Sequence, residues 1–347
     1  MSERPIGYVM EQTLGSITHY LNLKREEDAA GLPLPRWLPV EYEQGRLPWS
    51  LTGSLLARRA VRPVIDEVSG LFFHTNTIGL LCPDYSRRKP TVISSDGTPL
   101  NKRDMREAYG LRPERSAAEL AKRALYRGLF RSARGFVAWS SWTKASFVND
   151  YGCREEDVAV IPPGIHLDEF APGDRAHALP RILFVGGDFA RKGGELLLEV
   201  FRERLRGRAE LVLVTKGAVR DEPGVSVHRD VGANSQKLRE LYATSDVFAL
   251  PTRADCFPLV CMEALAAGLP LVGTRVGGLP DAIEEGVTGH LVPRDDAAAL
   301  GDALEDLVTD PRKREAMSRA CRADAGRRFG ARENARRLFE FVRSRCA

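Results

Sequence analysis

The chain has 347 residues, of which 43% are hydrophobic and 28% are charged, and its formal net charge at pH 7 is +4. This length exceeds that of a typical single domain, so we expect two domains with the composition of a soluble globular protein. The chain has no run of about 18 apolar residues and no CxxC pair among its six cysteines. These absences argue against a membrane-spanning helix, a zinc site and a disulfide framework.

The N-terminal segment, Met1 to Pro5, lacks the apolar core of a secretory signal peptide. A cytoplasmic location is therefore the default expectation. We interpret the cysteines as mostly buried thiols, and we treat Cys256 as an open exception because it lies in the loop with Asp255 that is described below.

The first half of the chain alternates apolar segments with helical ones, which predicts a parallel sheet wrapped by helices. The predicted strands are residues 6–10, 70–73, 91–94, 135–139 and 158–161. Residues 28–50 are rich in proline and carry Trp37 and Trp49, so we predict a loop or a short broken helix there.

The stretch from Pro162 to about Pro180 has little periodicity, and we interpret it as a linker between domains. The second half then repeats the alternation of strands and helices. Its predicted strands are residues 182–185, 211–215, 225–228, 247–250, 270–273 and 290–292. Its predicted helices include residues 195–204, 235–243, 297–308, 311–328 and 331–345.

The most informative stretch is residues 249–274, whose pattern predicts a strand, a loop, a helix beginning near Pro258 and a second strand. Asp255 in the loop and Glu263 in the helix are eight residues apart, which separates their backbones by about 10 Å. A retaining glycosidase needs its carboxyl groups about 5 Å apart, so this spacing suits instead two ends of one long ligand. The N–H groups at the helix start would favour an anion. The alternative is a solvated loop acid and an ordinary mid-helix glutamate.

A glycine-flanked loop at residues 186–194 follows another predicted strand and carries Arg191 and Lys192, which could meet a phosphate. It matches neither a P-loop nor the GxGxxG pattern, and the alternative is a turn with a solvated basic pair. Further glycine loops at 274–281 and 286–290 would gather at the same carboxyl edge of the sheet, where ligands bind. The chain has no Asp-x-Asp, which disfavours a metal holding a nucleotide diphosphate and leaves charge neutralisation to the two cations and helix dipoles.

Together, these motifs resemble the nucleotide-sugar half of the retaining GT-B-fold glycosyltransferases of sequence family four (glycosyl transferases group 1). The resemblance covers about residues 157–307. It rests on the segments 160–165, 184–186 with 192–193, 241–247, 255–263, 275–280 and 285–289, in that order. It implies two Rossmann-like domains facing across a cleft, an acceptor-binding one at 1–167 and a nucleotide-sugar one at 180–330. Residues 168–179 would be the linker, and the helix at 331–347 would cross back to the first domain.

The resemblance also implies roles for individual residues. Glu263 would bind the ribose hydroxyls of the donor, Asp255 would help to hold the sugar, and Lys192 would meet the diphosphate. The other implied donor contacts are Gly15, Gly187, Arg191, Phe257, Pro258, Leu259 and Val260, the last two through N–H groups at the helix start.

Two departures from the family pattern affect this assignment. The family usually has Glu where this chain has Asp255, and usually has Arg where this chain has Gly187. Arg191 could replace the lost charge, and the shorter Asp255 could alter the choice of sugar.

The N-terminal half matches the family less well. Residues 11–16, with Gly15, stand where similar enzymes place a glycine loop facing the donor phosphates, and His74 and Asp96 end two of the predicted strands. Both side chains are acceptor-binding candidates by their position at a carboxyl edge, and His74 joins Asp255 and Lys192 as a catalytic candidate. A packed or turn residue is the alternative for each.

The implied function is transfer of a hexosyl group from a nucleotide diphosphate sugar to a hydroxyl of a glycan, glycolipid or small molecule, with retained configuration. No cofactor or metal is expected beyond the nucleotide sugar as co-substrate. A nucleotide-sugar epimerase of related fold and a catalytically silent binding protein for sugar nucleotides or glycans are the alternatives.

Residues 87–134 carry 13 basic and 5 acidic side chains, with no motif for nucleic-acid binding. Within them, residues 116–131 predict a helix with apolar and cationic faces. Such a helix could lie on an anionic membrane, which would suit a lipid-linked acceptor and a peripheral place at the inner face of the membrane. Packing of its apolar face on the first domain is the alternative.

Overall fold

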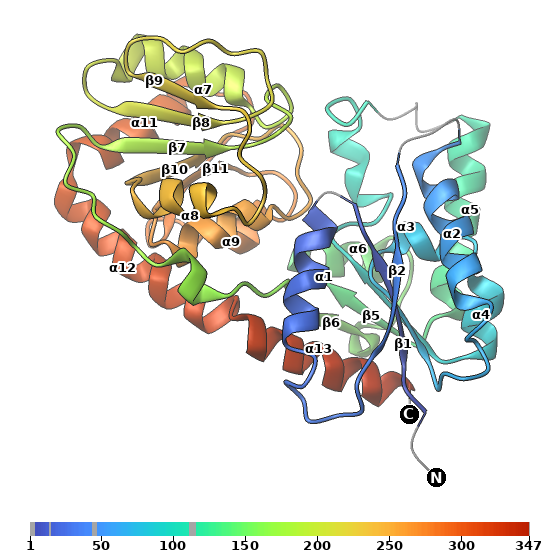
Figure 1. The fold of residues 1–347 in the computed structure, drawn as a ribbon. Coiled ribbons are helices and arrows are strands. Elements are labelled where there is room, and N and C mark those ends of the chain that lie inside the picture. The colour runs from blue at the N-terminus through green and yellow to red at the C-terminus, as the bar shows by residue number, and fades with distance from the viewer. Residues whose placement is uncertain (1–3, 14, 44–46, 111–115, 347) are drawn as a thin grey trace. The chain divides into compact units, whose positions relative to one another are not determined.

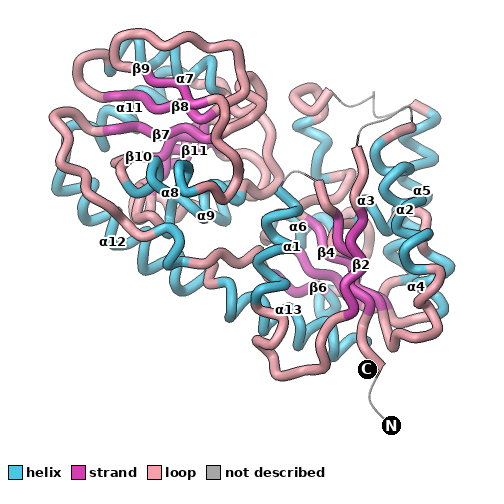
Figure 2. The backbone as a smooth tube through the Cα atoms, viewed as in Figure 1, coloured by secondary structure: helices cyan, strands magenta, loops and turns pink. Residues whose placement is uncertain are grey.

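The computed structural model describes residues 4–13, 15–43, 47–110 and 116–346, and these form two compact units (Figure 1). Unit 1 comprises the described residues of 1–106, 111–164 and 331–347, and unit 2 those of 107–110 and 165–330. Each unit contains a six-stranded parallel sheet with helices around it, which confirms the predicted two-domain α/β architecture (Figure 2). Leu14, inside the predicted glycine loop, and Ala347, at the end of the predicted last helix, lie outside the described residues.

The sheet of unit 1 has the strand order β2-β1-β3-β4-β5-β6. Its strands are β1 (Gly7–Glu11), β2 (Arg36–Val40), β3 (Leu71–Phe73), β4 (Thr91–Ser95), β5 (Gly135–Ala138) and β6 (Val158–Val160). Its α-helices are α1 (Gly15–Arg25), α2 (Trp49–Val61), α3 (Asn76–Gly79), α4 (Pro83–Arg88), α5 (Ala117–Ser132), α6 (Ser141–Asn149) and α13 (Ala331–Cys346), and its 3-10 turns are η1 (Asn101–Met105) and η2 (Glu155–Asp157).

The two faces of this sheet bury different helices, because alternate residues of a strand point to opposite sides. Tyr8 and Met10 of β1 belong to a core cluster with residues of α1 and α13, whereas Val9 packs in a cluster with residues of α2. Phe339 of α13 meets Tyr8 edge-on, with ring centroids 5.6 Å apart. The last helix of the chain therefore packs on the sheet of the first unit, as the predicted fold requires.

Strand β2 contradicts the loop or broken helix that the prolines of residues 28–50 predicted. It is an edge strand that pairs only with β1, and Pro39 lies opposite Met10. A proline has no N–H to give to a sheet, so it is tolerated at an edge, where one side of the strand needs no partner. The broken-helix part of the prediction was also wrong for Trp49, which begins the 13-residue helix α2.

The sheet of unit 2 has the strand order β12-β11-β10-β7-β8-β9. Its strands are β7 (Arg181–Val185), β8 (Glu210–Val214), β9 (Val225–His228), β10 (Val247–Leu250), β11 (Leu271–Thr274) and β12 (Gly289–Val292). Its helices are η3 (Leu167–Phe170), α7 (Gly194–Val200) with the π-turn η4 (Phe201–Leu205), α8 (Gln236–Ala243), α9 (Leu259–Ala266), α10 (Leu279–Ala282), α11 (Ala297–Thr309) and α12 (Pro311–Arg328). All six strands predicted in this half are present, with ends shifted by one residue at most.

The strand order places a topological switch point between β7 and β10. From β7 the chain proceeds outward through β8 and β9, and it then returns to the other side of β7 to form β10, β11 and β12. In open parallel sheets, ligands bind outside the carboxyl ends of the strands at this point. The loops that follow β7 and β10 are those that carry Lys192 and Asp255.

Helix α5 is the helix predicted at residues 116–131. Ser116 caps it by accepting a hydrogen bond from the Glu119 N–H, and its inner face buries Tyr126, Leu129 and Phe130 in unit 1. Its apolar face thus packs on the domain, although Leu120 remains 55% exposed on the outer side.

Among the described residues, no helix has both the length and the apolar character needed to cross a membrane.

Candidate functional site

The loops after β7 and β10 touch each other through their backbones. Gly193 adopts φ +77° at the start of α7, and a Cβ placed on it would lie 1.9 Å from the carbonyl oxygen of Pro251. A side chain is therefore excluded by both conformation and space. Gly193, in the segment 192–193 that contributes to the family resemblance, is thus a point of close approach between the two loops.

Thr252 ties the same loops together with hydrogen bonds. Its hydroxyl, fully buried, donates to the carbonyl oxygens of Arg191 and Ala254 at 3.2 and 3.1 Å. Its own carbonyl accepts from the Thr274 hydroxyl at 2.6 Å, which adds the end of β11 to the network. No sequence motif points to Thr252, because its role depends on residues at the ends of three separate strands.

Lys192 and Asp255 form an ion pair at this junction. The Lys192 Nζ donates to Asp255 Oδ2, and the two side chains are only 15% and 10% exposed. Arg191 extends along the same edge, where its Nη1 donates to the Ala254 carbonyl at 2.7 Å and its Nε to Asp188 Oδ2 at 3.0 Å. The two predicted cations and the predicted loop acid are thus brought together.

Glu263 lies on α9, is 6% exposed, and accepts a hydrogen bond from the Tyr242 hydroxyl at 2.9 Å. Burial raises the pKa of this carboxyl to about 7, although the Tyr242 hydrogen bond and the charge of Arg239 lower it. A buried group that can be either neutral or ionised near neutral pH is typical of a ligand site. Tyr242 occurs in one of the recognised segments, but the sequence does not show that it contacts Glu263.

The start of α9 differs by one residue from the prediction, because Pro258 is the N-cap and Leu259 is the first helical residue. No side chain caps this end. Leu259 and Val260 are half-buried, and the first N–H groups of a helix have no partner within it, so they can bind an anion. Phe257 is buried and packs against Phe329, with ring centroids 6.4 Å apart.

The loop after β11 packs closely against the loop that carries Asp255. Gly277 adopts φ +57°, and a Cβ there would lie 1.8 Å from the carbonyl oxygen of Asp255. The Gly278 N–H donates to the Cys256 carbonyl at 2.8 Å. Cys256 itself is 2% exposed, so its thiol is buried like most of the others.

Gly187, where the family usually has arginine, is exposed at the end of β7. A Cβ added to it would meet no atom within 4 Å. The missing arginine therefore leaves open space beside the Lys192 loop.

In unit 1, His74 follows β3 and is 0% exposed. Its Nε2 lies 2.7 Å from Nδ1 of His19, and both rings pack near Trp139. Burial lowers the pKa of His74 to about 4 and also lowers that of His19, so both rings are neutral at pH 7. Contact with a ligand would require the His74 ring to become uncovered, and its catalytic or acceptor role remains a prediction.

The other two unit 1 candidates lie at carboxyl ends of the sheet as predicted. Gly15 is the first residue of α1 and is exposed, and Asp96 directly follows β4 and is half-buried. The Asp96 carbonyl accepts a hydrogen bond from the Thr143 hydroxyl at 2.6 Å.

Glu11, at the end of β1, begins the segment 11–16 that was predicted as a glycine loop, and the sequence alone assigned it no role. It is 4% exposed and accepts hydrogen bonds from the hydroxyls of Thr13, Tyr42 and Thr75. These donors come from the segments after β1, β2 and β3, so the carboxylate ties together three loops at the switch point of the unit 1 sheet. Only the fold reveals this, because the donors lie up to 64 residues away.

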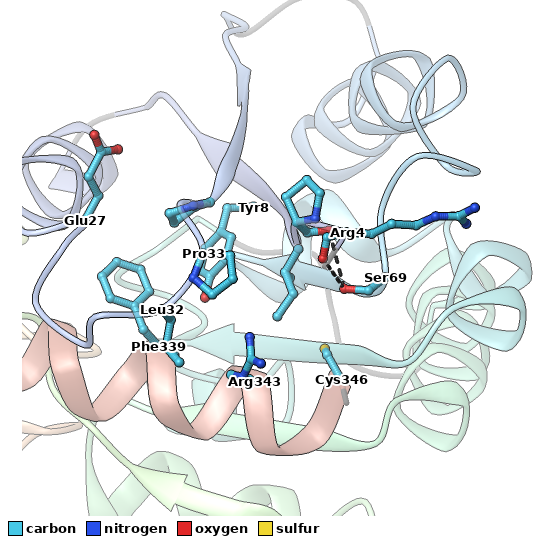
Figure 3. Close-up of a pocket in the computed structure, with 12 residues that line it drawn as sticks. Arg4, Tyr8, Glu27, Leu32, Pro33, Ser69, Phe339, Arg343 and Cys346 are labelled. Carbon is cyan, nitrogen blue, oxygen red and sulfur yellow. Dashed lines mark hydrogen bonds between the residues drawn. The ribbon is translucent and has the colours of Figure 1, made fainter. Parts of the chain in front are cut away.

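A separate cavity of about 260 Å³ lies at the opposite, amino end of β1 (Figure 3). Tyr8, Leu32 and Phe339 form part of its apolar lining, and the Ser69 hydroxyl donates to the Arg4 carbonyl at 3.1 Å near its edge. The predicted site residues of unit 1 are at the carboxyl end of the sheet, so this cavity does not belong to the candidate site.

Two family models match most of the chain. Residues 19–169 match the model described as Glycosyltransferase Family 4, and residues 179–310 match the one described as Glycosyl transferases group 1. A D-inositol 3-phosphate glycosyltransferase of Nocardia farcinica is 28% identical over 272 residues, which cover 71% of this chain and 59% of the relative. The chain spans from about half to four fifths of the length of such curated relatives.

Solved structures show the same fold. Sucrose-phosphate synthase of Thermosynechococcus elongatus aligns with a TM-score of 0.77 and 17% identity over 99% of both chains. Anabaena HepE in complex with UDP-glucose aligns with a TM-score of 0.75 and 17% identity over 99% of this chain and 100% of that one. With two parallel α/β units of this GT-B fold and a match to both halves, the chain belongs to the family-four, group 1 glycosyltransferases.

Proposed function

We propose that this protein transfers a hexosyl group from a nucleotide diphosphate sugar to an acceptor hydroxyl and retains the anomeric configuration. The observation that carries the proposal is the cluster at the switch point of unit 2. There the Lys192–Asp255 ion pair and the uncapped start of α9 lie on neighbouring loops, and the buried Glu263 lies one helical turn further on. The family resemblance implies a donor-binding role for each of these groups.

The cluster suits the three parts of such a donor. Glu263 would accept hydrogen bonds from the ribose hydroxyls, and the N–H groups of Leu259 and Val260 would meet the diphosphate together with Lys192. Asp255, with the backbone at Phe257 and Pro258, would hold the sugar. The UDP-glucose bound to HepE, which has the same fold, supports a nucleotide sugar as donor.

The reaction we propose exchanges one C–O bond for another on the same face of the sugar. The anomeric carbon loses its bond to the diphosphate oxygen and gains one to the acceptor oxygen, and the acceptor proton passes to the leaving phosphate. No nucleophilic side chain is required, so the contribution of the protein is positioning and stabilisation of charge on the departing diphosphate. Lys192 supplies that charge, and to do so it must share its ammonium group between Asp255 and the phosphate.

A hydroxyl of a polyol, glycan or glycolipid is the acceptor in this proposal. The curated relatives are named for inositol 3-phosphate, which supports a polyol. A lipid-linked acceptor would require contact with a membrane, and the outer side of α5 offers Leu120, Leu125, Arg127 and Arg131 for it.

The departures at Asp255 and Gly187 favour one second candidate, a protein that binds sugar nucleotides without turnover. Asp255 is one methylene shorter than the usual Glu, and no side chain replaces the usual Arg in the open space at Gly187.

One experiment separates these functions. The protein is incubated with a panel of nucleotide sugars, with and without acceptors, and release of the nucleotide diphosphate is followed. A transferase releases it faster when its acceptor is present, an epimerase converts the donor with none, and a silent protein binds the donor without product. Acceptor-independent conversion or binding without release would overturn the proposal.

A further inference from the structure

Unit 1 contains a cavity of about 310 Å³ at the carboxyl ends of β3 and β4. It lies between the first turn of α2, the start of α3, the turn η1 and the first half of α5. The residues that characterise its lining are Trp49, Asn76, Lys102, Arg106, Lys122 and Tyr126. Its volume falls in the range of small-molecule sites, about 300–1,000 Å³.

The cavity gathers more positive than negative charge. Three cationic side chains, those of Lys102, Arg106 and Lys122, line it together with one carboxylate, that of Glu119. Glu119 lies 3.5 Å from Arg106 and 4.0 Å from Lys122, so a single acid is placed between two cations. The Arg106 and Glu119 side chains are only 13% and 12% exposed, which limits their screening by water.

The pKa of Lys122 is lowered mainly by burial and in part by this concentration of charge. Burial lowers the pKa of its ammonium group most, and the nearby Lys102 and Arg106 lower it further, although Glu119 raises it. Bringing an anion into the cavity would relieve this repulsion.

One wall of the cavity is aromatic and rigidly held. The ring of Trp49 packs on that of Tyr42, with centroids 4.6 Å apart and planes inclined by 50°. Tyr42 is fixed in turn by its hydrogen bond to the buried Glu11. A fixed indole beside cations can contact the C–H face of a sugar or cyclitol ring while the cations bind a charged substituent.

We propose that this cavity is the acceptor pocket and that it selects a polyhydroxy acceptor carrying a phosphate group. Lys102, Arg106 and Lys122 bind the phosphate, and Trp49 lies against the carbon ring. Phosphate suits the pocket better than a carboxylate because it carries up to two charges and three terminal oxygens that several cations can contact at once. The identification of the bound molecule as the acceptor rests on the proposed function. Binding in the pocket, however, can be measured without turnover.

The first test is calorimetry of the whole protein with inositol phosphate, glucose 6-phosphate, the two unphosphorylated parents and inorganic phosphate. We expect the phosphorylated compounds to bind at least about tenfold more tightly than their parents. The double variant Lys102→Ala/Lys122→Ala should lose this preference. Arg87→Ala removes an exposed charge from α4 in the same unit, outside the lining, and should bind as the unaltered protein does.

A second variant distinguishes the ring contact made by Trp49 from the phosphate contacts made by the cations. Trp49→Leu should weaken binding of the phosphorylated polyols and leave binding of inorganic phosphate unchanged, because only the ring contact is removed. Equal binding of phosphorylated and parent compounds, or unaltered binding by the double lysine variant, would overturn the proposal.

A vesicle-binding experiment distinguishes a soluble phosphorylated acceptor from a phosphorylated lipid headgroup. Phosphatidylcholine vesicles that contain a phosphatidylinositol phosphate are compared with vesicles given the same charge by phosphatidylserine, and soluble inositol phosphate is compared with inositol. Preference for either phosphorylated form over its control supports the pocket and identifies the source, because the charge-matched vesicles remove the general attraction of a basic surface to an anionic membrane. Nucleotide diphosphate affinity, measured in the same variants, should not change because Lys102 and Lys122 lie in unit 1. Loss of donor binding or turnover with phosphate selectivity intact would count against the proposed function and not against the pocket.

Discussion

At the scale of single residues, Glu263 shows how burial gives a side chain its chemistry. A mid-helix glutamate on a solvated face is ionised at neutral pH, whereas Glu263 is buried beside Tyr242 and its pKa is raised to about 7. Without a bound ligand, this carboxyl is therefore partly protonated at neutral pH. A ligand that donates hydrogen bonds from its hydroxyls favours the ionised form.

We predict that Glu263→Gln weakens nucleotide sugar binding and leaves the fold intact. The variant loses a hydrogen bond to a charged group, about 1.5–3 kcal/mol, or roughly tenfold to a hundredfold in affinity. Calorimetry with the nucleotide sugar measures the change. Glu240→Gln on α8, at an exposed position, is the matched control. An unchanged affinity in a normally folded Glu263→Gln protein would show that the ribose role is wrong.

We also predict that nucleotide sugar affinity depends on pH through Glu263. Its pKa is raised in the folded protein, so the carboxyl is mostly protonated below about pH 7 and must lose its proton to accept hydrogen bonds from the ribose. Affinity should thus rise with pH up to about 7 and then level off, with a slope of at most about tenfold per pH unit below that point. Titrations between about pH 5 and 8 test this, and Glu263→Gln should show no such slope.

The same raised pKa affects folding in the opposite direction. The protonated carboxyl is favoured in the folded state, so its contribution to the free energy of unfolding is complete below the unfolded pKa of about 4.5 and is lost as pH rises through about 7. Ionisation of this buried carboxyl therefore costs stability at neutral pH. Occupation of the site by hydroxyl donors offsets this cost.

At the scale of elements, the loops at the carboxyl edge of unit 2 are held by close backbone contacts. Gly193 and Gly277 each adopt positive φ, and each faces a carbonyl oxygen where a Cβ would be. The loops behind Lys192 and Asp255 are therefore preorganised by contacts that admit no side chain at these positions.

We predict that Gly277→Ala lowers the free energy of unfolding of unit 2 by about 1–3 kcal/mol or more, because it adds positive-φ strain and a clash with the Asp255 carbonyl. Thermal unfolding followed by circular dichroism measures this. Gly187→Ala is the control in the same set of loops, since its Cβ would meet no atom, and it should stay within about 0.5 kcal/mol of the unaltered protein. Equal effects of the two changes would contradict the role assigned to the close contact.

Helix α5 carries two different surfaces that bear on the acceptor. Its inner face packs in unit 1 and contributes Lys122 and Tyr126 to the acceptor pocket. Its outer side exposes Leu120 and Leu125, the latter 40% exposed, near Arg127 and Arg131.

We predict that this outer side gives a salt-sensitive preference for anionic over neutral liposomes in sedimentation. Each basic residue near an anionic surface contributes about 1 kcal/mol, so Arg127→Glu/Arg131→Glu should remove the preference. Arg312→Glu/Arg319→Glu makes the same charge change at exposed positions of α12 and should leave it. If the unaltered protein shows no preference for anionic liposomes, a soluble acceptor is favoured.

At the scale of the whole molecule, charge neutralisation of the diphosphate depends on how the chain distributes its cations and helix ends. The full sequence has no Asp-x-Asp pair to hold a metal with the diphosphate. In the proposed function, Lys192, Arg191 and the start of α9 supply the positive charge at the switch point instead of a metal.

We predict that turnover survives removal of divalent metals. With the donor and acceptor found by the panel, product formation in EDTA should equal that in buffer with magnesium or manganese. A loss of activity in EDTA that either metal restores would show that Lys192 and the helix end do not carry the compensation.

The sequence by itself determined the parts of this protein that depend on local patterns. Short apolar segments between helical ones predicted eleven of the twelve strands that the described residues form, because hydrophobic periodicity indicates which face of each element is buried. The glycine loops with Lys192, Asp255 and Glu263 were recognised in the same way, as a set of motifs in a fixed order. Strand β2 was missed because its prolines predict loop locally, and they are tolerated only because the strand lies at an edge of the sheet.

The tertiary structure alone decided which of these groups are in contact and how far each is exposed to water. Lys192 and Asp255 are 63 residues apart in the chain and pair only because β7 and β10 are neighbours in the sheet. The raised pKa of Glu263, the three hydroxyls on Glu11 and the cations around the acceptor pocket likewise arise from side chains of distant segments. Desolvation and charge interaction depend on distances in space, which no local pattern of residues encodes.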